Sequence, residues 1–242
     1  MADNQDFLNP VCSLRTLDVF WGRREILTAL TEQLDRFHGI LLDIGCGRMP
    51  YRSLILARPD CVEQYIGMDL RSDLRDHRYA QYGPPDLEWD GRNIPLESGS
   101  VGCIIATEIL HQCPEVDVVL REAARVLQPG GTLFFTVPFL WPLHEAPHDQ
   151  YRYTPFALER HLKSAGFGHI NLKALGGWDS SLAQMLALWV RRRPMNRWKR
   201  EIFTRLATPL VKYLLKNDEP QPIFTDQTMI TRIAGTANRL ES

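Results

Sequence analysis

The chain has 242 residues, 44% of them hydrophobic and 24% charged, and its formal net charge is −1. This length and composition fit one large α/β domain, and they exclude fibrous and disordered chains. Because 28 Lys and Arg residues balance 29 Asp and Glu residues, we expect no nucleic-acid partner.

The cysteine pattern and the N-terminus predict a cytoplasmic protein. The five cysteines are scattered and form no Cys-x-x-Cys motif, which favours reduced thiols over a disulfide framework or a zinc ribbon. The N-terminal residues are acidic and polar, unlike those of a signal or transit peptide. The longest apolar runs, such as 133–140 and 182–190, are far shorter than the roughly 20 residues of a membrane-spanning helix.

Short apolar runs that end at turn residues alternate with amphipathic stretches along most of the chain. These runs predict strands at residues 39–44, 64–69, 87–90, 101–106, 132–138, 169–175 and 229–233. Near-continuous apolar strands that alternate with helices are typical of a doubly wound, mostly parallel sheet covered by helices on both faces. Ligands of such sheets bind outside the carboxyl ends of the strands.

Two helices have clear boundaries in the sequence. Apolar residues follow helical spacing from Val116 to Leu127, and we expect Pro129-Gly130-Gly131 to end that helix. Thr154 followed by Pro155 predicts a hydroxyl N-cap with proline in the first turn. Gly166 stands where a C-cap glycine belongs.

The chain divides by composition into four parts. We expect a helical N-terminal preface at 1–37, a ligand-binding core at 38–178, a basic helical insertion at 179–222, and a last strand with a tail at 223–242. Pro194 and Pro209 are expected to split the apolar faces of the insertion.

The insertion carries a strong positive charge, because residues 191–216 contain nine Arg and Lys residues and only one acidic residue, Glu201. It has two interpretations. It is either a cap that packs on the sheet and shapes a substrate pocket, or a surface for an anionic substrate or an anionic membrane.

A glycine turn follows the first predicted strand. Asp43-Ile44-Gly45-Cys46-Gly47 ends that strand, and its glycines let the backbone approach a ligand closely. Pro50 stands where a dinucleotide motif has its third glycine, and an acid at the strand end suits a cationic ligand better than a diphosphate. Asp69 ends the second strand, where a carboxylate can accept hydrogen bonds from a ribose.

These residues and five later segments identify a family resemblance. The later segments are Gly67-Met68-Asp69-Leu70, Asp90-Gly91 with Ile94-Pro95-Leu96, Val101–Ala106 with Thr107-Glu108-Ile109-Leu110-His111, Glu122–Gly131, and Ser164-Ala165-Gly166-Phe167. Together with the glycine turn, they resemble the motifs of class I S-adenosylmethionine (SAM)-dependent methyltransferases, in the type-11 branch of bacterial small-molecule enzymes. The resemblance covers about residues 38–175 and implies seven strands, the last of them antiparallel.

The resemblance implies a role for each matching residue. Asp43 would hold the amino group of the methionine moiety, and Gly45, Cys46 and Gly47 would pass beneath it. The nucleoside would be held by Asp69 on the ribose, Leu70 on adenine, and Asp90 with Gly91 at the exocyclic amine. Thr107 would line the methionine end, and Trp21 and Arg23 would close over the cofactor as N-terminal lids do in similar enzymes.

The loop at residues 139–154 follows the fifth strand and concentrates polar side chains beside the expected cofactor. Its His144-Glu145-Ala146-Pro147-His148 segment matches H-E-x-x-H, but proline inside the motif disfavours the helix that a metalloprotease needs, so we expect no metal. An alcohol or amine acceptor must lose a proton, and imidazole is suited to take it.

His144 or His148 is therefore the candidate base, and Asp149 or Glu145 would orient its ring. The alternative is that the loop residues only hold the loop in place. His111 would touch the acceptor or the cofactor, or cap its own loop. Trp141, Tyr151 and Arg152 are the candidate substrate-binding residues.

The resemblance therefore implies methyl transfer from SAM to an oxygen or nitrogen of a small molecule, such as a sugar or natural-product hydroxyl, releasing S-adenosylhomocysteine. Two alternatives stay open. One is an inactive methyltransferase-like module that binds a partner through its basic helices; the other is methylation of a lipid-linked or quinone acceptor at a membrane surface.

Overall fold

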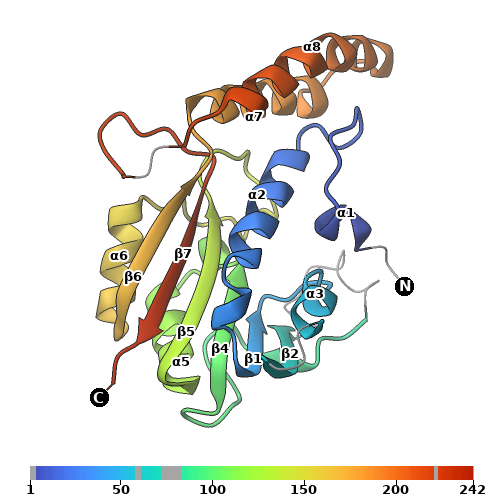
Figure 1. Cartoon of the computed structure of the whole chain (residues 1–242). Coiled ribbons are helices and arrows are strands. Elements are labelled where there is room, and N and C mark those ends of the chain that lie inside the picture. The colour runs from blue at the N-terminus through green and yellow to red at the C-terminus, as the bar shows by residue number, and fades with distance from the viewer. Residues whose placement is uncertain (1–3, 58–60, 72–82, 221–222, 242) are drawn as a thin grey trace.

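The computed structural model describes residues 4–57, 61–71, 83–220 and 223–241. Its centre is a seven-stranded sheet in the order β3-β2-β1-β4-β5-β7-β6 (Figure 1). The strands are β1 (Gly39–Ile44), β2 (Val62–Leu70), β3 (Leu87–Trp89), β4 (Val101–Thr107), β5 (Leu127–Pro138), β6 (Phe167–Leu175) and β7 (Arg232–Arg239). The strands β1 to β5 run parallel, whereas β7 runs antiparallel to both of its neighbours, which confirms the predicted fold class.

Helices cover both faces of the sheet (Figure 1). On one face, α5 (Val116–Val126) and α6 (Pro155–Ser164) bury residues such as Leu120 and Leu162 in the larger core cluster. On the other face, α2 (Phe20–Thr31) and α3 (Arg52–Leu56) bury Leu30 and Ile55 in a second cluster. The short α1 (Gln5–Leu8) contacts α2. Single turns of 3₁₀ helix, η1 and η2, cover Leu34–Arg36 and Leu110–Gln112.

The predicted ends of two helices can be compared with the structure. The N-cap of α6 is confirmed, because the Thr154 hydroxyl accepts the Ala157 N–H at 3.2 Å and Pro155 is the first helical residue. The end of α5 comes one residue earlier than expected. Pro129 and Gly130 do not lie in a separate turn, because β5 already begins at Leu127 and includes them.

The expected last strand was placed too early in the sequence. Residues 229–233 only reach the beginning of β7, which starts at Arg232 and runs to Arg239. This strand lies between β5 and β6, so its small and polar residues Thr236 and Ala237 are buried although they form no apolar run.

The basic insertion forms an antiparallel pair of helices, α7 (Trp178–Arg192) and α8 (Arg197–Asn217). Pro194 separates them as expected, but Pro209 lies inside a continuous α8 and does not divide it. Asp218 fixes the pair, because its carboxylate accepts the N–H groups of Gly177 and Ser180 at 2.9 and 2.8 Å. The pair lies beyond the carboxyl ends of the parallel strands (Figure 1).

Candidate functional site

The glycine turn after β1 is a tight bend that only glycine can form at its first position. Gly45 has a φ angle of 69°, and a Cβ there would lie 2.5 Å from the Ile109 side chain. The N–H groups of Gly45 and Cys46 both donate to the Met68 carbonyl oxygen on β2, at 2.8 and 3.1 Å. The chain then continues through a second glycine, Gly47, with a φ of 52°. The bend is thus held at the carboxyl end of the sheet, where a ligand is expected.

Asp43, at the end of β1, is a buried acid. Its Oδ2 accepts a short hydrogen bond from the Tyr65 hydroxyl, and its Oδ1 has no hydrogen-bond partner in the part of the chain that the structure describes. Burial raises the pKa of Asp43 to about 7, against the lowering effect of the Tyr65 hydrogen bond, and the nearby Asp69 raises it further. A buried carboxylate oxygen without a partner is suited to a cationic group such as an ammonium.

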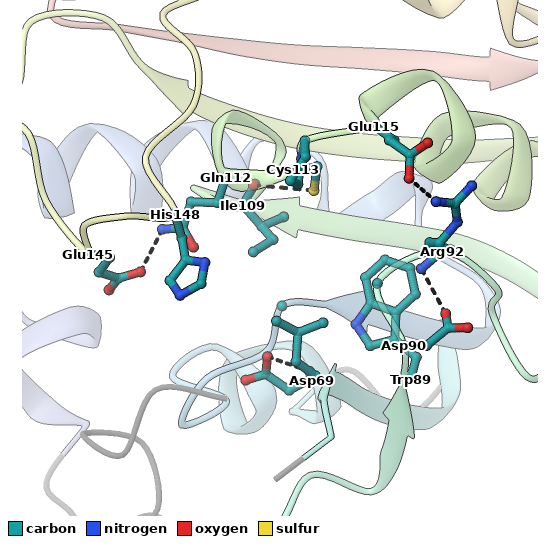
Figure 2. Close-up of a pocket in the computed structure, with 14 residues that line it drawn as sticks. Asp69, Trp89, Asp90, Arg92, Ile109, Gln112, Cys113, Glu115, Glu145 and His148 are labelled. Carbon is teal, nitrogen blue, oxygen red and sulfur yellow. Dashed lines mark hydrogen bonds and ion pairs between the residues drawn. The ribbon is translucent and has the colours of Figure 1, made fainter. Parts of the chain in front are cut away.

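A pocket of about 370 Å³ lies beside the bend (Figure 2), within the volume range usual for small-molecule sites. The ends of β1, β2 and β3, the segment around η2 and the loop after β5 surround it. Its wall consists of Gly45, Asp69, Leu70, Trp89, Asp90, Gly91, Arg92, Ile109, Gln112, Cys113, Pro114, Glu115, Glu145 and His148. It therefore combines apolar and aromatic surface with two carboxylates from neighbouring strand ends.

Those two carboxylates are held by the backbone. Asp69 accepts the N–H groups of Gly47 and Leu70 at 3.1 and 2.8 Å, so its side chain is fixed between the bend and the pocket. Asp90 accepts the backbone N–H groups of Arg92 and Asn93 and the Asn93 side-chain amide. The Asn93 hydrogen bonds and that of the Arg92 N–H lower the pKa of Asp90 to about 2. Asp90 stabilises its own turn, whatever else it binds.

The loop after β5 forms the opposite wall of the pocket. Glu145 and His148 face the pocket in Figure 2, and the His148 N–H donates to the Glu145 carbonyl oxygen at 2.8 Å. The Gln112 amide donates to Glu145 Oε2 at 2.7 Å and joins the loop to η2. Residues 144–148 form no helix, so their H-E-x-x-H pattern does not have the geometry of a metalloprotease site.

A polar cluster lies behind this wall. The side chains of His111 and Asp149 are buried, with His111 Nε2 3.9 Å from Asp149 Oδ1. The rings of His111 and His144 are stacked with 5.8 Å between their centres. Donor atoms of these three residues lie within 4.8 Å of one another, which is close enough for one metal ion to contact all three. Arg152 donates to both carboxylate oxygens of Asp149, at 2.5 and 2.7 Å.

The charges in the cluster follow from burial and pairing. The Arg152 hydrogen bond is the largest cause that lowers the pKa of Asp149, to about 2. Burial lowers the pKa of His111 to about 3, although Asp149 acts in the opposite direction. At neutral pH His111 is therefore an uncharged imidazole, and neither of its ring nitrogens has a hydrogen-bond partner in the described segments.

The remaining predicted residues lie outside this pocket. Thr107 ends β4 and pairs with Thr136 of β5. The Tyr151 hydroxyl donates to the Pro114 carbonyl oxygen at 2.9 Å, which fixes the loop. The guanidinium groups of Arg192 and Arg232 lie 4.8 and 5.2 Å from the ring centre of Trp141.

Sequence reasoning missed the buried Arg232. It lies opposite Pro138 where β5 ends, and its Nε donates to Glu108 Oε2 at 3.3 Å. Its Nη1 and Glu108 Oε1 have no hydrogen-bond partner within the described residues. The preface packs over this arginine, since a Cβ on Gly22 would lie 2.4 Å from the guanidinium. Trp21 and Arg23 do not line the pocket. Arg23 instead pairs with Asp6 at 3.4 Å, and its guanidinium lies 4.5 Å from the Phe7 ring centre.

The comparisons with known proteins agree with this geometry. A family model described as a methyltransferase domain, of the type-11 group, matches residues 42–135. The malonyl-[acyl-carrier protein] O-methyltransferase of Methylococcus capsulatus is 27% identical over an alignment of 190 residues that covers 69% of each chain. The fatty-acid O-methyltransferase of Mycolicibacterium smegmatis is 35% identical over 101 residues, which are 40% of this chain and 36% of that protein.

Residues 42–135 are a class I SAM-dependent methyltransferase domain of the type-11 branch. A solved structure of a SAM-dependent methyltransferase from Archaeoglobus fulgidus has the same fold, with a TM-score of 0.55, 14% identity, and coverage of 89% of this chain and 93% of that one. The family match confirms the predicted recognition and, with it, SAM as the cofactor of the family. The chain spans less than half of the length of several curated relatives that it matches, for example 22% and 36% of two of them.

The pocket contains part of the predicted cofactor set. Gly45, Asp69, Leu70, Asp90 and Gly91 line it, and so does the candidate base His148. The residues that the prediction missed include Trp89, Ile109 and Gln112, which come from segments next to the matched motifs. Trp89 directly precedes Asp90 in the sequence. An aromatic residue next to a motif residue could have indicated that Trp89 lines the pocket, because an aromatic ring offers a flat surface on which adenine can stack.

Proposed function

We propose that this methyltransferase moves the methyl group of SAM to an oxygen of a small-molecule acceptor, at the pocket beyond the carboxyl ends of β1 and β2. SAM supplies a methyl group on a positively charged sulfur, and the chain must bind it, align the acceptor and accept a proton. The observation that carries the proposal is one pocket that joins Asp69, at the end of β2, to His148, on the loop after β5.

The pocket residues divide into an adenosine side and an acceptor side. Asp69 would accept the ribose hydroxyls, because its carboxylate lies at the pocket wall, and the adenine would lie between Trp89 and Ile109. The buried Asp43 would attract the amino group of the methionine moiety through its Oδ1. These roles use the groups that the fold already holds in place, so binding requires little reordering.

His148 is the proposed base for a hydroxyl acceptor. A ring nitrogen of His148 would take the acceptor proton while the acceptor oxygen forms its bond to the methyl carbon. The bond between the methyl carbon and the SAM sulfur would break in the same step, its electron pair would go to the sulfur, and S-adenosylhomocysteine would leave. In the proposed arrangement His144 is a positioning residue, since its ring stacks on that of His111 with 5.8 Å between the ring centres. Its backbone N–H also donates to Asp149 Oδ2 at 3.1 Å and fixes the loop. The sugar or natural-product hydroxyl remains the acceptor that we favour for this chemistry.

A second acceptor class is a carboxylate, which needs no base because it is already ionised at neutral pH. Two observations favour it. Arg232 is a buried guanidinium with one nitrogen that lacks a partner in the described part of the chain, next to the strand ends. Two relatives are named as O-methyltransferases of a fatty acid and of malonyl-[acyl-carrier protein]. An inactive binding module and an N-methyltransferase are the further alternatives.

The test uses methyl transfer from labelled SAM to a panel of hydroxyl, carboxylate and amine acceptors. For a hydroxyl acceptor, we expect His148→Ala to lower kcat at least ten-fold with little change in the affinity for SAM, and His144→Ala to lower kcat less. For a carboxylate acceptor, His148→Ala should leave kcat almost unchanged and Arg232→Ala should raise KM for the acceptor. If SAM does not bind in calorimetry, or no acceptor of the three classes is methylated, the proposal is wrong.

A further inference from the structure

The solvent-facing side of α7 is apolar. Its exposed residues Trp178, Leu182, Met185 and Trp189 follow one another at intervals of four, three and four residues, so they lie on one face, and each is 42–63% exposed. Before the last turn, where Arg192 is exposed, no polar side chain of α7 is exposed. A surface helix of a soluble domain normally has charged and polar residues on this side.

A second apolar stripe runs along α8. Trp198, Ile202, Leu206, Leu210 and Tyr213 follow helical spacing and are 47–70% exposed. They lie on the side of α8 opposite its buried residues. Ala207, Val211 and Leu214 on the buried side form a small apolar cluster together with residues of α7. The stripe is therefore not explained by the packing of α8 on its neighbour.

The two stripes adjoin. The ring of Trp189 on α7 contacts that of Phe203 on α8, with 5.6 Å between the ring centres. We call the nine exposed residues of the two stripes the hairpin face. Figure 1 shows the two helices together beyond the strand ends, with one end of α8 projecting past the sheet. A continuous apolar surface of this kind on a folded chain marks an interaction site.

Positive charge borders the hairpin face. Arg193, Lys199, Arg205, Lys212 and Lys216 are all exposed. The Arg193 guanidinium lies 4.1 Å from the Trp189 ring centre, and the Lys199 ammonium 5.4 Å from that of Trp198. The one acidic residue of this segment, Glu201, is already paired with Arg197 at 3.3 Å. A partner for this surface must combine an apolar interior with negative charge at its boundary.

We propose that the α7–α8 hairpin binds the surface of an anionic phospholipid membrane, with the hairpin face in the acyl boundary and the bordering cations at the headgroups. This combination of an apolar face, tryptophans and basic residues is the pattern of helices that lie in the membrane interface. No helix in the described ranges is long and apolar enough to cross a bilayer. The hairpin would therefore lie on the membrane.

The charge pattern also favours a membrane over a second copy of this chain as the partner of the hairpin face. Two copies that met through the hairpin face would bring their bordering cations together, and like charges at short distance oppose association. Anionic lipids would instead neutralise them. The position suits a membrane-borne acceptor, because Arg192 at the end of α7 contacts Trp141 of the loop that follows β5. This inference goes beyond the proposed function, since membrane binding can be measured without any acceptor.

The experiment is co-sedimentation of the full chain with vesicles of phosphatidylcholine alone or mixed equally with phosphatidylglycerol. We expect partitioning at least ten-fold stronger on the anionic vesicles, since each bordering Lys or Arg contributes about five-fold. The double variant Leu182→Glu/Leu206→Glu should lose at least ten-fold in partitioning. The matched control is Phe156→Glu, on α6 away from the hairpin and 68% exposed in the wild type, which should bind as the wild type does. Unchanged thermal unfolding would show that the variants are folded.

A second variant separates charge from apolar contact. Lys212→Glu/Lys216→Glu should lower partitioning on anionic vesicles at least ten-fold and have little effect on neutral ones. The proposal is wrong if the wild type does not sediment with anionic vesicles, or if Phe156→Glu loses as much binding as the double leucine variant. A different pair of results would also overturn it: light scattering shows a dimer that Leu206→Glu dissociates, and no variant changes vesicle binding. In that case a second copy of the chain covers the hairpin face.

Discussion

Replacing Asp43 by asparagine should stabilise the fold, and more strongly as the pH rises. Burial raises the pKa of Asp43 from 3.8 to about 7, so the folded state resists its ionisation. The folded chain therefore binds more protons than the unfolded chain between about pH 4 and 7, and stability falls as the pH rises through that range. Asparagine cannot ionise, and its amide oxygen can still accept the Tyr65 hydroxyl.

The magnitude follows from the two pKa values. One pKa unit is worth about 1.4 kcal/mol, so the raised pKa of Asp43 costs about 2 kcal/mol at pH 5, where the folded chain keeps the carboxyl group protonated and the unfolded chain does not. The cost is about 4 kcal/mol at pH 8, where the ionised carboxylate is buried. The stability difference between Asp43→Asn and the wild type should consequently widen by about 2 to 3 kcal/mol between these pH values. The cost is that the variant loses the charge proposed to attract the amino group of SAM.

The assay is urea unfolding of both proteins at pH 5, 6, 7 and 8, followed by tryptophan fluorescence. A control comes from Tyr65→Phe, which removes the hydrogen bond but leaves the carboxyl group and should retain a steep pH dependence. A stability difference that is the same at all four pH values would refute the reasoning, and so would a wild type that gains on the asparagine variant as the pH rises.

Three further predictions concern the site and its frame. In urea unfolding, Asp149→Asn should lose about 2 kcal/mol of stability at pH 7. The reason is that Arg152 lowers the pKa of Asp149 to about 2, so its ionised form stabilises the fold above about pH 4. The loss should shrink as the pH falls toward 2. Gly45→Ala should lower the free energy of unfolding by at least about 1 kcal/mol, since alanine is strained at a φ of 69° and its Cβ would meet Ile109. The double variant Gly45→Ala/Ile109→Ala should recover part of that loss. Trp89→Ala should weaken SAM binding at least five-fold in calorimetry, whereas Phe156→Ala should not.

Much of the sheet could be predicted because its parallel strands are continuous apolar runs. Four of the six residues of β1 and six of the seven residues of β4 are buried, so Leu41, Leu42 and Ile104 identify these strands without knowledge of the fold. The strand β7 could not be placed in this way. Its residues Gly235, Thr236 and Asn238 carry no apolar pattern, and their burial depends on β5 and β6, which join the strand from distant parts of the chain.

The failure at Pro209 has a local cause. Proline removes one backbone hydrogen bond, and the rule that it ends a helix assumes that nothing compensates. In α8 Pro209 is exposed, so water can satisfy the freed carbonyl group, while Ala207 and Val211 on either side remain packed in the cluster shared with α7. The sequence did not show which face of α8 packs against α7.

The candidate site was predictable where it depends on motifs at strand ends. Gly45 and Asp69 were found because they end the first and second strands, and the structure brings them to one pocket. Arg232 was not found, because it reaches Glu108 only through the antiparallel pairing of β7 with β5, more than 120 residues along the chain. The position of His148 relative to His144 also depends on the path of an irregular loop, which the sequence does not determine.

Calorimetric titration of SAM into the wild type and Asp69→Ala tests the central claim most directly, with Glu97→Ala as a control on an exposed acid outside the pocket. Our account predicts one SAM per chain for the wild type and for the control, and an affinity at least ten-fold lower for Asp69→Ala. Equal SAM affinity in all three proteins would contradict it, as would the absence of binding to the wild type.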